Sequence, residues 1–136
     1  MDLKEKVQES GVVGAGGAGF PAHVKIDAEV EYVIANGAEC EPLIHKDGEL
    51  MERFAEGVVE GLKLVMAATG AQNGIIGIKE KKARAVEALK RATSGTEIKI
   101  HLLDDYYPAG DEVMLVYEAT GRLILPGGIP LDIGVV

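Results

Sequence analysis

The sequence predicts an α/β domain in which a parallel sheet is flanked by helices. Two short apolar segments, at residues 30–35 and 74–79, are typical of buried strands, and residues 96–103 form a third predicted strand. Segments with helical periodicity lie between them. This alternation of strand and helix favours right-handed crossovers and therefore parallel strands. The length of 136 residues fits one domain, and the 47% share of hydrophobic residues is sufficient for a core.

Composition argues against several classes of function. The formal net charge of −8 should repel nucleic acids and anionic lipid surfaces. No apolar run is long enough for direct insertion into a membrane. The single cysteine, Cys40, cannot by itself hold a zinc ion or an iron–sulfur cluster, and it indicates a reducing, cytoplasmic location. The histidines are too scattered to form a ligand set, so metal-dependent hydrolysis has no support.

The first elements precede the core of the domain. A short charged helix is expected at residues 2–10 and should end at Gly11, because further glycines follow closely. Residues 11–21 hold five glycines and two alanines, too little side chain for an ordinary helix or strand. We therefore expect a loop whose backbone forms the working surface. The strand at residues 30–35 follows it and is nearly continuous in apolarity, as in a strand covered on both faces.

Three more helices are predicted around the remaining strands. One should run from Asp47, its N-cap, to Gly70, with an apolar stripe at three- and four-residue spacing. The stripe comprises Leu50, Met51, Phe54, Val58, Leu62, Val65 and Met66. The next helix is expected at residues 79–93, and the last at about residues 110–120. Each is followed by a glycine, the residue that most often ends a helix.

The glycine loop is the first candidate binding site. Gly14, Gly16 and Gly19 satisfy the dinucleotide pattern G-x-G-x-x-G, but that pattern needs a strand before it and a helix opening at its end. A charged helix precedes it here and Phe20 follows, so a classical dinucleotide-binding domain is only an alternative. Glycines still let backbone N–H groups approach a phosphate or a flat ring, and Lys25 is the nearest cation. Otherwise the glycines only allow tight packing, and Lys25 is a solvated lysine.

A second candidate, NGAECEP at residues 36–42, directly follows the first predicted strand, where open parallel sheets bind ligands. The amide of Asn36 suits the imide edge of a flavin or a base. In an extended chain, Glu39 and Glu41 would point the same way and accept hydrogen bonds from ribose hydroxyls. Alternatively, the glutamates form a solvated acidic loop and Cys40 is a small buried apolar residue.

The third candidate is YPAGDE at residues 107–112, at the entry to the last predicted helix. Backbone N–H groups at a helix N-terminus bind anions. Asp111 and Glu112 can also occupy that position themselves, as acids of the first helical turn. Spacing alone leaves both interpretations open. The sequence offers no Ser-His-Asp or Cys-His arrangement, so nucleophilic catalysis is unsupported.

Together the three motifs establish a family resemblance. GVVGAGGAGFPAHVK, NGAECEP and YPAGDE, in this order, resemble the flavin- and NADH-binding domain of the complex I 51 kDa subunit, whose pattern is approximately GRGGAGFPTGxKW, NADESEP and YxxGEE. The chain is more similar to the Rnf complex C subunits and their relatives, the proline-reductase-associated electron-transfer protein and the cobalamin reductase of propanediol utilisation. The final GGIPLDIGVV is also similar to theirs.

The resemblance implies a fold and a site. Residues 1–136 should form an FMN- and NADH-binding domain with a Rossmann-like parallel sheet, of the type found in the 51 kDa subunit. The apolar tail without a polar cap indicates a fragment of a longer protein. The residues implied to line the FMN site are Gly14, Ala15, Gly16, Lys25, Asn36, Ala38, Glu39 and Cys40. Those implied to close the pocket are Tyr107, Gly110, Asp111 and Glu112. Those implied to lie toward NADH are Phe20, Lys25 and Glu41.

The implied function is electron transfer. Hydride would pass from NADH to FMN, and electrons would leave singly to iron–sulfur clusters in other parts of the parent protein or in partner subunits. Through those partners a cytoplasmic domain would lie at the periphery of a membrane complex. The departures from the complex I pattern are Ala15 for Arg, Ala38 for Asp, Cys40 for Ser and Asp111 for Glu. The alternative is a non-catalytic scaffold that retains the fold without flavin, and Ala15 favours it.

Overall fold

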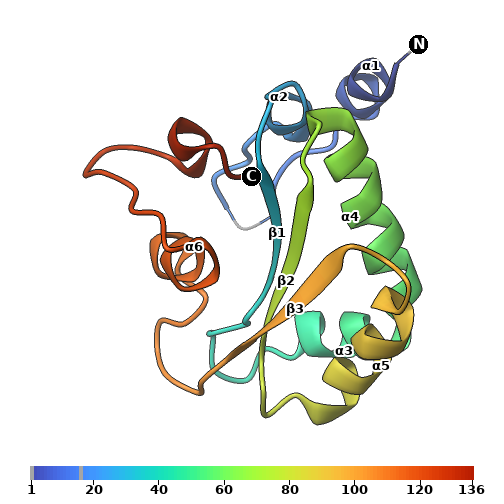
Figure 1. Cartoon of the computed structure of the whole chain (residues 1–136), viewed down its shortest axis with the longest axis vertical. Helices are drawn as coiled ribbons and strands as arrows, with labels where there is room; N and C mark the ends of the chain where they lie inside the picture. The colour runs from blue at the N-terminus through green and yellow to red at the C-terminus, as the bar shows by residue number, and fades with distance from the viewer. Residues whose placement is uncertain (1, 16) are drawn as a thin grey trace.

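The computed structural model describes residues 2–15 and 17–136, and it confirms the predicted α/β class. Its sheet has the strand order β1-β2-β3, with β1 at Tyr32–Gly37, β2 at Asn73–Lys79 and β3 at Ile98–Leu103 (Figure 1). Both strand pairs are parallel, as the alternation of elements predicted. The carboxyl ends of the strands therefore meet at one edge, where parallel sheets usually bind ligands.

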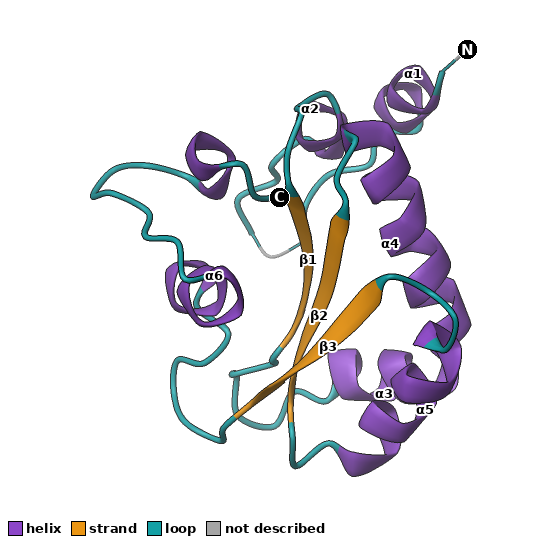
Figure 2. Ribbon diagram, viewed as in Figure 1, coloured by secondary structure: helices purple, strands orange, loops and turns teal. Residues whose placement is uncertain are grey.

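Helices cover the two faces of the sheet unequally (Figure 2). On one face lie α3 (Lys46–Arg53), α4 (Ala55–Thr69) and α5 (Ala83–Thr93), and on the other lies α6 (Glu112–Thr120). The central strand β2 is buried in six of its seven residues, so its apolar run reflects cover on both faces. Among the described helices, none is long and apolar enough to cross a membrane.

The main core lies between the sheet and the three-helix layer. Ile76 and Ile78 of β2 are fully buried, in one cluster with Val59 and Leu62 of α4 and Leu89 of α5. Burial of a side chain of this size contributes about 1.5–3 kcal/mol. This apolar contact, more than the helical propensity of single segments, holds the layer against the sheet.

The predicted helix from Asp47 to Gly70 is two helices. The helix is interrupted at Phe54, whose φ and ψ of −128° and 36° lie outside the helical region. The N-cap of the first helix is His45, so the prediction of Asp47 as the cap is wrong, and Asp47 lies in the first turn. Gly70 ends the second helix in the left-handed conformation, as predicted.

The break also changes which apolar side chains are buried. Leu50 and Phe54 are 49% and 62% exposed, although the predicted stripe placed both in the core. A continuous stripe assumes one uninterrupted helix, and the break resets the helical phase. Met51 and Leu62 of the same stripe are buried as predicted, and Ala55 is buried beside the break.

Other predicted boundaries differ by a few residues. The short charged helix is confirmed as α1 (Leu3–Glu9). The last helix begins after Asp111, because the side chain of this residue caps it. Two elements lie in segments for which no helix was predicted, α2 (Ala22–Ile26) and the 3-10 helix η1 (Pro130–Ile133). Both have at most five residues, too few for a periodic pattern.

The end of the chain extends the sheet beside β1. The N–H of Ile34 donates to the carbonyl of Val136 at 2.7 Å, and the N–H of Val136 donates to the carbonyl of Tyr32 at 3.0 Å. A parallel bridge joins Tyr32 and Val135. The end of the apolar tail, residues 134–136, is therefore packed against β1, and it lies on the same side of β1 as α6 (Figure 1).

Candidate functional site

Two predicted motifs meet at the carboxyl edge of the sheet. The side-chain amide of Asn36 donates to the carbonyl of Gly110 at 2.8 Å, across 74 residues of sequence. Its oxygen accepts from the N–H of Ala38 at 3.2 Å. The N–H of Gly110 donates to Cys40 Sγ at 2.9 Å. NGAECEP, which follows β1, and YPAGDE, which leads into α6, therefore form one structure.

The two motifs approach closely at Gly110. A Cβ built on Gly110 would lie 3.1 Å from both Ala38 Cβ and Cys40 Sγ, closer than about nine in ten observed Cβ contacts. Beneath this contact lies a second core cluster, on the α6 face of the sheet, formed by Ala38, Leu103, Ala109 and Leu115. Cys40 is half-buried at its margin. The thiol therefore packs and accepts a hydrogen bond, close to its interpretation as a small core residue.

Glu39 is engaged with protein groups. Its carboxylate is 3% exposed and accepts from the N–H groups of Asp47 at 2.8 Å and Gly48 at 3.4 Å. Lys82 Nζ lies 3.3 Å from it. Burial raises the pKa of Glu39, but these donors outweigh burial and hold the pKa below its usual value. The expectation that Glu39 and Glu41 point the same way is wrong, because Glu39 has a φ of +39° and Glu41 is exposed.

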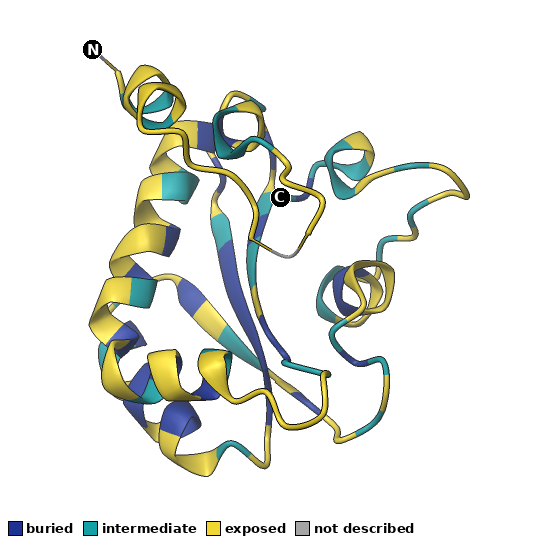
Figure 3. Cartoon of the chain, turned by 180° about the vertical axis from the view of Figure 1, so that it is seen from behind, coloured by how far each residue is buried: buried dark blue, intermediate teal, exposed yellow. Residues whose placement is uncertain are grey.

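The glycine loop closes on itself. Val13 and Pro21 form an antiparallel bridge, and the N–H of Gly14 donates to the carbonyl of Phe20 at 2.8 Å. Its described residues, Ala15 included, are exposed (Figure 3). Gly16 lies outside the described residues. The loop thus presents backbone to solvent, as expected from its composition.

A cavity of about 250 Å³ brings together residues of two motifs and of the tail. It is lined by Ala18, Phe20, Lys25, Glu112, Ile129, Pro130, Leu131 and Val136. Lys25 Nζ lies 5.5 Å from the centre of the Phe20 ring, within the range of cation–π attraction. Phe20, Lys25 and Glu112 were all predicted as site residues, and the fold places them around one space.

The tail residues of this cavity were not among the predicted site residues. Ile129, Pro130, Leu131 and Val136 belong to GGIPLDIGVV, a segment that resembles related proteins but for whose residues no role was predicted. Their place depends on the pairing of the tail with β1, across about a hundred residues of chain. The one feature of the sequence that could have indicated their place was the apolar composition of the tail, because apolar side chains favour burial against the rest of the fold.

The remaining predicted residues lie around these contacts. The side chain of Asp111 caps α6, accepting from the N–H groups of Val113 at 3.0 Å and Met114 at 3.1 Å. The capping interpretation of Asp111 therefore describes its contacts. Tyr107 is 75% exposed. Neither Tyr107 nor Glu41 is among the described residues that line the 250 Å³ cavity. Roles of Tyr107 and Glu41 toward a ligand stay predictions.

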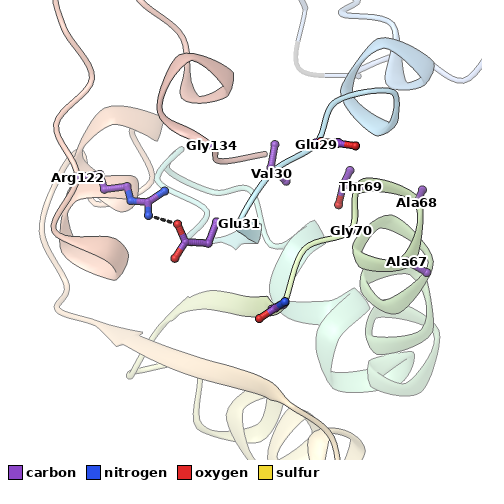
Figure 4. Close-up of a pocket in the computed structure, with 10 residues that line it drawn as sticks. Glu29, Val30, Glu31, Ala67, Ala68, Thr69, Gly70, Arg122 and Gly134 are labelled. Carbon is purple, nitrogen blue, oxygen red and sulfur yellow. Dashed lines mark hydrogen bonds and ion pairs between the residues drawn. The ribbon is translucent and has the colours of Figure 1, made fainter.

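A wider cavity of about 830 Å³ lies at the opposite edge of the sheet (Figure 4). It opens beside the C-terminal end of α4, near the start of β1, and none of the predicted site residues lines it. Arg122 forms an ion pair there with Glu31 and donates to the carbonyl of Ile133 at 2.8 Å. Its guanidinium also stacks 4.8 Å from the centre of the Tyr32 ring. Arg122 thus secures the tail to β1.

The chain is similar to known proteins over nearly its whole length. The family described as the Nuo51 FMN-binding domain matches residues 7–136. The chain is 49% identical over 135 residues to cobalamin reductase PduS of Salmonella typhimurium, covering 99% of this chain and 30% of that protein. It is 43% identical over 139 residues to the C subunit of the Na(+)-translocating ferredoxin:NAD(+) oxidoreductase complex of Acetobacterium woodii, covering 98% and 31%.

A solved structure shares the fold. The NAD(+)-reducing NiFe hydrogenase in its H2-reduced state matches with a TM-score of 0.80 and 27% identity, over 98% of this chain and 27% of that one. The chain spans about three-tenths of the length of the curated relatives above. The motif resemblance is therefore confirmed, and the chain belongs to the Nuo51 FMN-binding domain family, whose other members include subunits of electron-transfer oxidoreductases.

Proposed function

We propose that the chain binds FMN at the carboxyl edge of its sheet and accepts hydride from NADH there, as one domain of an electron-transfer oxidoreductase. The proposal rests above all on the direct contact of NGAECEP with YPAGDE, at the edge where parallel sheets bind ligands. Membership of an FMN-binding family supports it. When bound, FMN supplies the chemistry, because a flavin takes up hydride and releases electrons.

Asn36 has hydrogen-bonding capacity left for a ligand. A side-chain amide carries two N–H donors and an oxygen with two lone pairs. The contacts with Gly110 and Ala38 use one donor and one lone pair. The side chain is exposed, yet these contacts fix its orientation. The remaining donor and acceptor suit the pyrimidine edge of a flavin, which offers both kinds of partner.

The glycine loop and Lys25 suit the phosphate end of FMN. A Cβ built on Gly17 or Gly19 would meet no atom within 4 Å, and φ is positive at both residues. The exposed backbone can therefore approach a ligand closely. Lys25 brings a cation to the adjoining cavity, in a chain whose net charge is −8. These residues would bind and orient the cofactor, and none needs to act as an acid or a base.

The cavity beside the loop suits part of NADH. Phe20 offers an aromatic face, and Glu112 offers a carboxylate that accepts hydrogen bonds from ribose hydroxyls. A volume of about 250 Å³ is below the range of about 300–1,000 Å³ for sites that hold a whole drug-sized ligand. The cavity would therefore hold one ring system of the dinucleotide, with the rest against the exposed loop.

A titration of the chain with FMN tests the flavin claim. Binding should quench flavin fluorescence and shift its absorbance spectrum. Lys25→Met should weaken FMN binding by about tenfold, because it removes a charge-assisted contact of roughly 1.5 kcal/mol or more. Lys90→Met, an exposed lysine on α5 at the sheet face opposite α6, removes the same charge and should leave binding unchanged. Absence of any flavin binding by the folded chain would refute the proposal.

The scaffold alternative retains one supporting observation. Ala15 supplies no cation where the complex I pattern has Arg. A scaffold would fold and bind no flavin, so the same titration separates the two functions. If flavin binds, we propose iron–sulfur domains or partner subunits as the acceptors of its electrons, because the matched relatives are about three times as long as this chain.

A further inference from the structure

The turn between β2 and α5 contacts both motif loops. It carries the sequence KEKK at residues 79–82, between the end of the central strand and the start of α5. No predicted binding motif falls within it. The two neighbours of β2 in the sheet are β1, which leads into NGAECEP, and β3, which leads into YPAGDE. The turn is therefore placed between the two loops that meet at Asn36 and Gly110.

Lys82 ties the turn to NGAECEP. Its Nζ lies 3.3 Å from the Glu39 carboxylate, and the two side chains are 23% and 3% exposed. A Cβ built on Gly48 would lie 3.3 Å from Lys82 Cδ and Nζ, so the lysine stem lies directly over the first turn of α3. Glu39 in turn holds the N–H groups of Asp47 and Gly48. One carboxylate thus joins β1, α3 and α5.

Lys79 and Lys81 tie the same turn to the loop that carries YPAGDE. Both contact Asp105, with Nζ to carboxylate distances of 3.3 Å for Lys79 and 2.7 Å for Lys81. The Lys79 side chain is only 6% exposed. Hydrogen bonds from Lys81 and Lys79 hold the pKa of Asp105 below its usual value. A buried ammonium is costly without a partner, so Lys79 favours loop positions that keep Asp105 beside it.

We propose that the ion pairs of this turn, Lys82 with Glu39 and Lys79 with Asp105, position the two motif loops for flavin binding. The proposal rests on the proposed function above. Neither carboxylate need touch the cofactor. Each pair fixes one loop to the end of the central strand or to the turn that follows it, and the two loops together hold Asn36, Cys40 and Gly110 in contact. Glu39 is accordingly a positioning residue rather than a ligand of FMN.

The main core does not depend on these pairs. It packs the sheet against α3, α4 and α5 through apolar side chains. Loss of a pair should therefore leave the chain folded while the loops move apart. A role limited to stability would lower the midpoint of thermal unfolding and leave FMN affinity unchanged at temperatures far below it. FMN affinity of the folded chain is the readout that separates the two.

Lys82→Met and Asp105→Ala test the two pairs separately, in the full chain. Each should raise the Kd for FMN by about tenfold, within the usual range of coupling between residues in contact. Lys82→Arg keeps a cation opposite Glu39 and should restore most of the affinity. The matched controls are Lys90→Met, an exposed lysine on α5 paired with Glu87, and Asp104→Ala, the exposed neighbour of Asp105. Both should bind FMN within about twofold of the parent chain.

Amide hydrogen exchange supplies a readout without flavin. Lys82→Met should speed exchange at Asp47, and Asp105→Ala should speed exchange at Gly110, because each amide depends on the positioned loop. Parent-like FMN affinity in both variants would overturn the positioning role. If the parent chain binds no FMN, the proposed function fails instead. Unchanged exchange at both amides would then overturn the positioning role on its own.

Discussion

Gly110 joins the two motif loops at a point where a side chain would be crowded. A Cβ at this position would lie 3.1 Å from Ala38 Cβ and Cys40 Sγ. We predict that Gly110→Ala lowers the free energy of unfolding by about 1–3 kcal/mol, the usual cost of overpacking. Gly57→Ala is the control, because a Cβ there meets open space on α4 and alanine favours helix. Urea unfolding measures both, and a Gly110→Ala chain as stable as the parent would contradict the assignment.

Glu39 should make stability depend on pH. Its pKa is lowered in the folded chain, so its contribution is full above the pKa of the unfolded chain and is lost as pH falls through the folded pKa. Glu39→Gln should therefore be less stable than the parent at about pH 7, and the difference should shrink toward about pH 3. Glu41→Gln, an exposed neighbour, should show no such trend. Urea unfolding across this pH range measures the difference in free energy of unfolding between the parent and Glu39→Gln. A difference that stayed constant with pH would contradict the account.

Sequence reasoning located these residues but not their environments. Asn36, Cys40 and Gly110 lie in motifs that a resemblance could find. The burial of Glu39 could not be read from the motif, because it depends on a positive φ and on Lys82, 43 residues away. A glutamate two residues before an exposed glutamate has the same local sequence whether its side chain faces a ligand or a helix N-terminus.

At the scale of elements, α6 depends on its cap. Asp111 accepts from two backbone N–H groups at the start of the helix. Asp111→Ala should lower the free energy of unfolding by about 1 kcal/mol, the typical value of an N-cap. Asp111→Asn keeps a capping oxygen and should lose much less. Thermal or urea unfolding distinguishes them, and equal losses in the two variants would indicate that charge, rather than capping, matters here.

The strands β1 and β2 were predicted well because their apolar runs are nearly continuous, and the ends of all three strands shifted by two residues or fewer. The helix break at Phe54 was missed because no glycine or proline marks it. Helices α2 and η1 were missed because they are too short for an amphipathic pattern to repeat. Local pattern thus predicts long regular elements, and contacts with the rest of the fold decide breaks and short turns.

At the scale of the whole molecule, the two faces of the sheet differ in role: one holds the main core, and the other carries residues of the candidate site. The face covered by α3, α4 and α5 holds the main apolar core. The other face, with α6 and the tail, carries the second core cluster and the residues of the 250 Å³ cavity. The family and the fold were predictable, because three motifs in order are specific. The tail as a wall of the cavity was not, because its place depends on pairing with β1.

The most direct measurement is the absorbance of the FMN-loaded chain after addition of NADH without oxygen. If FMN lies at the carboxyl edge and NADH reaches it from the cavity of Phe20 and Glu112, the oxidised flavin spectrum should bleach. It should bleach far faster than free FMN under the same conditions, because binding holds the two rings in place. A chain that retains FMN with no faster bleaching would contradict the nucleotide site, and one that retains no FMN would contradict the flavin site as well.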